Sequence, residues 1–544
     1  MPITPTYPGV YIDELPSAVR TIVGVPTSVA AFVGTAPRGA VDEPVHITSW
    51  EDFTAEFGGL DSGTALAYAV FQFYANGGSE AEIVRVVAKN HNTTLDDADA
   101  ADATPARNYA SASVIALAGG VTLHAASPGG WPNDRNLRVR VDYDTAPDPA
   151  GKLYNLTVRD VKSGITEQYL NVSTDTTSAR ALKHVLASSS LLSSTVVEGD
   201  GSRPAAHDTV TDGSDPFPDD PQGKNLYSVV TTPGADGDAP NNLDYLGDEE
   251  TKTGLYALLK ADIFTMLCLP GAPGLIGGAD NILSSAMKFC VDRRAMLIVD
   301  PDPNWKKPSD VTRAVRSTSP AFVLNDPNAK NASLYFPRIV LPDPNKDNSP
   351  QEFPPCGALA GIWARTDVQR GVWKAPAGTE AGLSGVTALT VPLTDKQNGV
   401  LNPLGVNCLR GLPVVGNVVW GARTQRGADV LADQWKYLPV RRLALYLEES
   451  LYRGTQWVVF EPNDEPLWSS IRLNVGAFLN TLFRQGAFQG RTPKEAYLVK
   501  CDATNNPQND IDRGIVNILV GFAPLKPAEF VLIHIQQLAG QIQV

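Results

Sequence analysis

The sequence predicts a multidomain protein of the α/β class, α+β overall, with an inserted domain made mostly of β-strands. A chain of 544 residues is too long for one hydrophobic core. From Gly254 onward, short apolar runs alternate with amphipathic helical patterns, which is typical of a mostly parallel sheet covered by helices. Residues 131–235 instead alternate apolar and polar side chains, which indicates β-strands with one solvated face.

Residues 1–20 are predicted to form a stiff, extended arm that carries one short strand. Prolines lie on both sides of this strand, at Pro2, Pro5, Pro8 and Pro16. Each proline fixes its own φ, biases the preceding residue toward an extended conformation and cannot donate to a β-ladder. The strand comprises Val10, Tyr11, Ile12, Asp13 and Glu14. We expect its partner strand to lie far away in the sequence or in another molecule.

Residues 21–90 are predicted to be the N-terminal part of the core, a compact α/β unit. The run VAAFVG at 29–34 is a short buried strand. Ser49 can cap a helix that ends at Gly58. A second helix, ALAYAVFQFYANGG, precedes a returning strand at 81–87.

Residues 91–235 are predicted to be an inserted, acidic, β-rich outer domain. Residues 92–250 hold 24 Asp and Glu against 11 Lys and Arg, a net charge of −13, while the rest of the chain is nearly neutral. A segment of this composition is typical of a solvated surface. The absence of basic clusters argues against nucleic-acid binding.

The C-terminal half is predicted to contain an α/β domain, a second core domain and a tail. These regions are residues 236–420, residues 421–536 and residues 537–544. One helix ends at Gly454, the run QWVVF follows as a strand, and a long helix runs on to Gly486. The apolar stripe of that long helix comprises Leu467, Ile471, Val475, Phe478 and Leu482. Asn474 is expected on another face, and two apolar strands close the chain.

Catalytic motifs are missing, so we expect no enzyme activity, cofactor or metal. The sequence contains no GxxxxGK[ST] phosphate loop and no HExxH. Asp300 could supply the carboxylate of a catalytic triad, but no histidine lies between His207 and His534 to carry the proton. The five cysteines are scattered, which favours buried reduced thiols. No apolar run is long enough to span a membrane, and the N-terminus lacks a secretory signal.

Several stretches resemble contractile tail sheath proteins of phages, tailocins and extracellular injection systems. The first is YPGVYIDELPS…VPTSVAAFVGTAPRG at the N-terminus. The later ones are RGVWKAPAG, LNPLGVNCLRGLPVVGNVVWGART, YLPVRRLALYLEESLYRGTQWVVFEPND and FRQGAFQGRTPKEAYLVKCD. Together they cover residues 1–90 and 350–536, in the family's order. The resemblance implies a core built from both chain ends and a subtilisin-like α/β domain without catalytic activity.

The resemblance also implies partners. Subunits of this family stack as six-membered rings around an inner tube protein, between a baseplate and a tail-terminator protein. The N-terminal arm and a C-terminal strand would pair with sheets of neighbouring copies. That C-terminal linking strand comprises Phe530, Val531, Leu532, Ile533, His534 and Ile535. The candidate contacts with the tube are Arg441, Arg442, Arg453, Arg472 and Arg484, on either of the two C-terminal helices.

Two other classes of protein remain as alternatives. One is a catalytically dead relative of an α/β hydrolase, and the other is a non-contractile scaffold or adhesin module. An adhesin would be expected to carry a signal peptide. A sheath subunit would instead be made in the bacterial cytoplasm and assembled into a phage tail or phage-tail-like particle that cell lysis can release.

Overall fold

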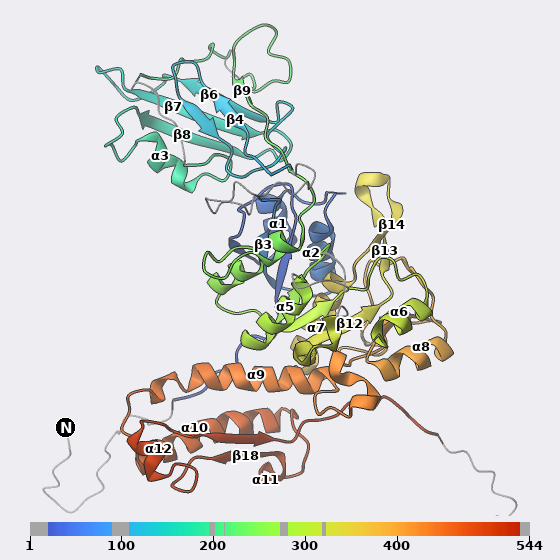
Figure 1. Cartoon of the computed structure of the whole chain (residues 1–544). Coiled ribbons are helices and arrows are strands. Elements are labelled where there is room, and N and C mark those ends of the chain that lie inside the picture. Colours follow the sequence, from blue (N-terminus) through green and yellow to red (C-terminus); the bar gives the residue numbers. More distant parts are fainter. Residues whose placement is uncertain are drawn as a thin grey trace, which may run out of the picture. The chain divides into compact units, whose positions relative to one another are not determined.

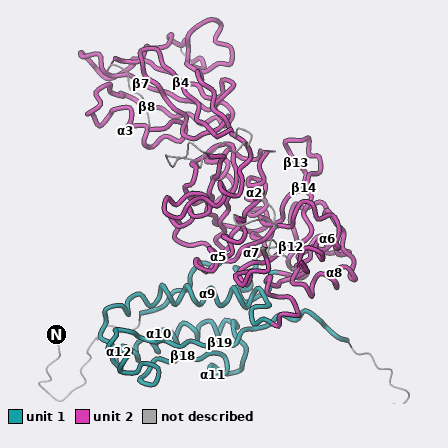
Figure 2. Tube along the Cα trace, viewed as in Figure 1, with its two compact units in different colours: residues 1–27, 366–376, 433–544 teal, residues 28–365, 377–432 magenta. Residues whose placement is uncertain are grey.

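The computed structural model divides the chain into two compact units. It describes residues 20–61, 63–89, 108–194, 202–211, 213–272, 281–317 and 323–533. Unit 1 comprises residues 1–27, 366–376 and 433–544, and unit 2 comprises residues 28–365 and 377–432 (Figure 2). The chain therefore enters unit 1 three times.

Unit 2 contains a mixed sheet of eight strands within the described residues. In spatial order they are β17 (Gly416–Val419), β16 (Asn407–Leu412), β12 (Ala332–Phe336), β11 (Met296–Val299), β10 (Met266–Cys268), β1 (Val29–Gly34), β3 (Glu80–Arg85) and β2 (Pro44–Ile47). The central strands pair in parallel, and only the edge strands β17 and β2 run antiparallel to their neighbours. The predicted α/β class is confirmed, and its subtilisin-like character stays a prediction.

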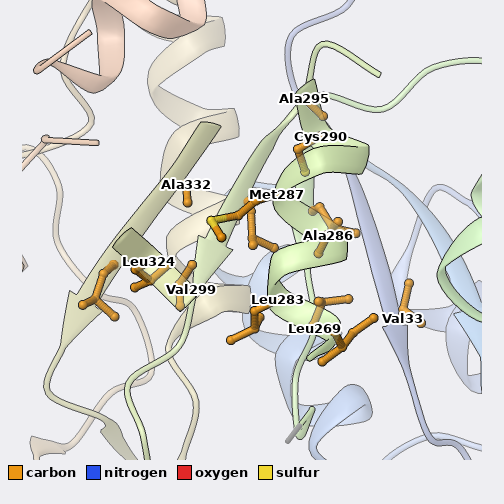
Figure 3. Packing of buried hydrophobic residues seen from close by; sticks show 14 of the residues in the cluster. Val33, Leu269, Leu283, Ala286, Met287, Cys290, Ala295, Val299, Leu324 and Ala332 are labelled. Carbon is orange, nitrogen blue, oxygen red and sulfur yellow. The ribbon is translucent and has the colours of Figure 1, made fainter. Parts of the chain in front are cut away.

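Helices pack on this sheet because their apolar faces are buried against it. Those lying wholly in unit 2 and outside the insertion are α1 (Trp50–Phe57), α2 (Ala65–Ala75), α4 (Asn242–Leu246), α5 (Ile282–Asp292), α6 (Pro308–Val315) and α8 (Asp395–Leu401). The short helix α3 (Leu182–Val185) lies in the insertion and packs in its separate core. In Figure 3, Leu283, Ala286 and Met287 of α5 lie among core residues that include Val299 of β11 and Ala332 of β12. Every residue of β1 and β11 is buried, as expected for central parallel strands.

The predicted helix ends near the N-terminus are confirmed. The side chain of Ser49 accepts a hydrogen bond from the backbone N–H of Asp52 at the start of α1. Gly58 ends this helix with φ 96°, a left-handed conformation that glycine adopts without strain. Residues 28–89, predicted to belong to the N-terminal part of the core, contribute β1, β2 and β3 to the large sheet.

The acidic insertion folds as an antiparallel β-domain within unit 2 (Figure 1). Its four-stranded sheet has the order β8 (Thr166–Ser173), β7 (Leu153–Asp160), β6 (Leu137–Asp142) and β9 (Ser228–Val229). A hairpin of β4 (Val114–Ala116) and β5 (Thr122–His124) lies beside a separate apolar core. A smaller sheet elsewhere in unit 2 consists of β14 (Ser349–Phe353), β13 (Ile339–Asp343) and β15 (Ala388–Leu389).

Buried arginines join this insertion to the α/β body. A guanidinium nitrogen of Arg38 lies 2.5 Å from a carboxylate oxygen of Asp160, and both side chains are buried. Arg85 donates to backbone carbonyl oxygens on both sides, 2.7 Å to Ala36 and 2.9 Å to Pro128. Hydrogen-bond acceptors on the insertion therefore pair with guanidinium groups that are buried in the α/β body.

Unit 1 is built mainly from two long helices and a two-stranded sheet. Its elements are α9 (Leu438–Gly454), α10 (Glu465–Arg484), α11 (Pro493–Ala496), α12 (Gln508–Asp512), β18 (Tyr497–Lys500) and β19 (Leu519–Phe522). The helix α7 (Cys356–Arg370) crosses from unit 2 into unit 1. The predicted apolar stripe of α10 is confirmed, since all five of its members are buried in one core cluster.

Two C-terminal predictions were wrong. The run QWVVF contains a 3₁₀ turn, Gln456–Val458, because Trp457 and Val458 pack against the helical core and do not join a sheet. Asn474 is buried on α10, where it meets the N-terminal segment of unit 1. Residues 530–533 form no strand within the single chain, and their pairing with a neighbouring copy stays a prediction.

Candidate assembly surfaces

The first part of unit 1 to be described, residues 20–27, lies on the two long helices. The backbone N–H of Arg20 donates to Oδ1 of Asn474 over 3.1 Å. The Arg20 guanidinium lies 4.6 Å from the centre of the Trp457 ring and 3.8 Å from a carboxylate oxygen of Glu461. These contacts determine where the predicted arm joins the folded unit.

Ile22 anchors the same segment in the helical core. Its side chain is buried against α9 and α10. A Cβ atom added at Gly454 would lie only 2.5 Å from Cγ2 of Ile22. The backbone N–H of Val25 donates to Oγ of Ser450 over 3.2 Å. Gly454 was expected only to end a helix, but the close approach of the N-terminal segment also requires a glycine there.

A buried ion pair holds three segments of unit 1 together. Arg442 of α9 donates to both carboxylate oxygens of Asp367, over 2.8 Å and 2.5 Å, and to the carbonyl oxygen of Thr27 over 3.1 Å. The two side chains are 3% and 1% exposed. Burial raises the pKa of Asp367, and the Arg442 guanidinium acts in the opposite direction. We call these three residues the Arg442 clamp.

Arg441 is the second predicted tube contact that lies in the interior. Its guanidinium stacks 4.7 Å from the centre of the Trp435 ring and lies 3.4 Å from a carboxylate oxygen of Glu448. Burial lowers the pKa of Arg441. Arg441 and Arg442 therefore stabilise the subunit and do not present charge to a partner, which corrects the expectation for both.

The other three predicted tube contacts reach solvent. Arg453 pairs with Glu449 over 2.7 Å, one turn earlier on α9. Arg472 pairs with Glu465 over 2.5 Å and donates to the carbonyl oxygen of Cys501. Arg484, in the last turn of α10, is exposed. These positions can present positive charge to another molecule.

The sheet formed by β18 and β19 has free edges. Tyr497 pairs with Phe522 and Lys500 with Leu519 in an antiparallel register. Among the described residues no other strand joins this pair. Leu498 and Leu519 are 54% and 53% exposed. The unpaired backbone groups along the edges can accept an added strand.

The predicted linking segments contribute no strand to the described structure. Phe530, Val531, Leu532 and Ile533 are 73–80% exposed. His534 and Ile535 of the C-terminal segment lie outside the described residues, as does the N-terminal strand Val10–Glu14. An apolar run this exposed is typical of a segment that binds elsewhere.

Asp300, which was considered as a triad carboxylate, accepts a hydrogen bond at the start of a helix. It follows β11, and its Oδ1 accepts the backbone N–H of Cys356, the first residue of α7, over 2.8 Å. Burial raises the pKa of Asp300 to about 6. Burial also raises the pKa of the Cys356 thiol well above its ordinary value. All five cysteines are buried and unpaired, as predicted.

The described residues contain no group of three or more His, Cys, Asp or Glu side chains arranged to hold a metal ion. None of the helices in the described ranges is long and apolar enough to cross a membrane.

Two residues that organise unit 1 were missed at the level of sequence. Asp367 lies 75 positions before Arg442, and no local pattern links the two. Asn474 did leave a signal, because it lies three positions after Ile471 and one before Val475, on the apolar side of the helix. A polar residue inside such a stripe indicates a buried hydrogen bond.

Comparison with known proteins gives two matches to family domains. Residues 241–425 match the phage tail sheath protein central domain. Residues 432–537 match the phage tail sheath C-terminal domain. The tail sheath protein of Vibrio phage KVP40 is 30% identical over 182 residues, which is 33% of this chain and 26% of that protein. The tail sheath protein of Enterobacteria phage T4 is 29% identical over 161 residues, 29% of this chain and 23% of that protein. The chain thus matches about a quarter of the length of each curated relative.

Solved structures share the fold over nearly the whole chain. The helical sheath of the anti-feeding prophage in its contracted state has a TM-score of 0.53 and 21% identity, covering 98% of this chain and 100% of that chain. The contracted sheath of the PVC extracellular contractile injection system has a TM-score of 0.54 and 20% identity, covering 99% of each chain. The sheath tail protein of Listeria innocua has a TM-score of 0.57 and 13% identity, covering 93% of this chain and 96% of that one.

Proposed function

Because the chain belongs to the contractile tail sheath family, we propose that it is the repeating subunit of a contractile sheath. Its copies polymerise as stacked six-membered rings around an inner tube and contract to drive the tube through a target envelope. The observation that carries this proposal is the pair of family matches, which together include more than half of the chain. The partners are further copies, the tube protein, and the baseplate and tail-terminator proteins of a phage tail or phage-tail-like particle.

The edges of the β18–β19 sheet support assembly by strand addition. The sheet packs on α10 through one face, and an added strand would extend its backbone hydrogen bonding at the edge. Backbone hydrogen bonds supply the affinity in such contacts, and alternate side chains supply the register. The segments proposed to add from neighbouring copies are the apolar run 530–535 and the N-terminal strand Val10–Glu14. The contacts of Arg20 and Ile22 would transmit load from the N-terminal strand into unit 1.

We place the contact with the tube on the exposed arginines. Arg453, Arg472 and Arg484 present charge outward, whereas Arg441 and Arg442 are used inside the subunit. Charge reversal at the correct position should release the tube and leave the sheath assembled.

The proposed role needs no catalytic site, and two side chains support this. Asp300 is engaged as a helix cap, and its neighbour Cys356 is a buried thiol that burial keeps protonated. Neither is free to act on a substrate.

Electron microscopy of the full chain expressed alone tests this function. We expect hollow striated cylinders, and single particles at every concentration would refute the sheath role. Deletion of residues 1–16 should leave the thermal unfolding of the subunit almost unchanged, because the described contacts of unit 1 begin at Arg20. The same deletion should abolish cylinders. Normal cylinders from the truncated chain would refute the arm, and loss of folding would show that the arm pairs within its own chain.

A further inference from the structure

The turn between α9 and α10 contains a phenylalanine where glycine is favoured. The backbone N–H of Glu461 donates to the carbonyl oxygen of Val458 over 3.2 Å. Val459 has φ −65° and ψ 128°, and Phe460 has φ 71°. These angles define a type II turn, whose third residue needs a positive φ and is usually glycine. For a bulky side chain this conformation is strained.

The strained turn does not bury the Phe460 side chain against any other part of the described structure. The Phe460 side chain is fully exposed, at 102%, and Val459 is 59% exposed. Trp457 and Val458, just before them, pack against the core of unit 1. A strained and exposed phenylalanine is a candidate for an external contact, because an aromatic side chain supplies the large apolar area that binding uses.

A cavity on the same unit is large enough for an aromatic ring. It has a volume of about 260 Å³ and lies between residues 20–27, α9 and α10. Ile22, Tyr446, Ala477, Phe478 and Leu482 form its apolar walls. The rest of the lining is Thr21, Gly24, Asn474, Thr481 and Gln485. An apolar cavity of about 150 Å³ lined by Leu, Ile and Phe is known to bind benzene. The cavity can therefore accept a phenyl side chain.

We propose that Phe460 of one copy inserts into this cavity of a second copy of the chain. This contact rests on the proposed function, because it is one of the contacts through which copies assemble. Phe460 precedes the first turn of α10, whereas the cavity lies along the second half of that helix. Donor and acceptor surfaces are therefore different, and such a contact repeats head to tail and builds rings or helices.

Charges beside the two surfaces are complementary. Glu461 follows Phe460, and its pair with Arg20 is long, at 3.8 Å, and solvent-exposed, so it holds the carboxylate weakly. Arg484 is exposed next to Gln485 at the cavity. The acidic side chain beside Phe460 and the basic one beside the cavity have opposite charge, which favours this pairing over others and leaves the tube contact to Arg453 and Arg472.

The test uses Phe460→Gly in the full chain. Glycine relieves the strained turn, so the melting temperature of the subunit should stay the same or rise, while assembly should fall at least tenfold by sedimentation. A residue with a purely structural role would not give this combination. Phe460→Tyr should assemble normally. The matched control is Val414→Gly, since Val414 is also fully exposed at φ 70° and should not affect assembly.

A second variant tests the cavity. Ala477→Phe should fill it and block assembly in the same way. In a mixture, Phe460→Gly chains keep an intact cavity and Ala477→Phe chains keep an intact phenylalanine. The two should therefore form pairs that cannot extend.

Three results would overturn the contact: normal cylinders from Phe460→Gly, an equal loss with Val414→Gly, or a mixture without pairs. If the unaltered chain does not assemble either, the sheath function itself fails.

Discussion

Removing Asp367 should destabilise unit 1 more than any surface substitution. In the Asp367→Ala variant, Arg442 stays buried and loses the carboxylate to which it donates two hydrogen bonds. Breaking one partner of a buried ion pair costs about 3–5 kcal/mol. For a domain of this size each kcal/mol lowers the melting temperature by about 2–4 °C. We therefore expect the transition of unit 1 to fall by roughly 6–20 °C.

Differential scanning calorimetry measures this shift, and two further variants make it specific. Arg453→Ala removes an exposed i,i+4 pair and should change the unfolding free energy by about 0.5 kcal/mol or less. The double variant Asp367→Leu with Arg442→Met replaces both charges with apolar groups and should recover most of the loss. An Asp367→Ala variant within about 1 kcal/mol of the unaltered chain would show that the clamp does not stabilise the unit.

Two further predictions concern buried charge. Because the folded pKa of Asp300, about 6, lies above its ordinary value of 3.8, the folded state holds a proton that the unfolded state loses between these pH values. Its stabilising contribution is complete below pH 4 and falls by about 3 kcal/mol as the pH rises through 6. We therefore compare the unfolding free energies of Asp300→Asn and the unaltered chain in urea. The free energy of the variant relative to that of the unaltered chain should rise by about 3 kcal/mol between pH 4 and 7. A difference that does not change with pH would contradict the raised pKa of Asp300. Joining Lys89 to Pro240 by a short linker removes the insertion and with it Asp160, but Arg38 then reaches water and keeps its bonds to the carbonyl oxygens of Thr54 and Ala55, so the shortened chain should stay soluble. Aggregation of the shortened chain under conditions where the full chain is soluble would contradict this.

Local patterns predicted the elements whose packing is local. The 3.6-residue spacing from Leu467 to Leu482 requires only that one side of a helix be buried, and it is. The cap at Ser49 likewise depends on neighbours within four residues. Predictions failed where distant segments decide. The β-branched run after Gln456 has strand propensity, but Trp457 is held as part of a turn by packing against the helices.

The candidate surfaces were predictable to a similar extent. The apolar run at 530–533 was visible in the sequence, but a strand forms only where a partner backbone is present, and none lies beside it in the described structure. The five arginines were predicted to contact the tube because they lie on the two C-terminal helices and carry positive charge. Sequence spacing could not tell that Arg442 points toward Asp367 and that Arg453 does not, because that depends on the path of α7.

The hydrogen bond between Arg20 and Asn474 also has a consequence during synthesis. These residues are 454 positions apart, so at about 5–20 residues per second the N-terminal segment waits roughly 20–90 s for its binding site to leave the ribosome. Chains terminated before α10 lack Asn474 and cannot dock this segment. Completion of α10 is therefore a condition for placing the N-terminal arm, and products that lack this helix would not enter the proposed polymer, where one defective link would weaken the whole lattice.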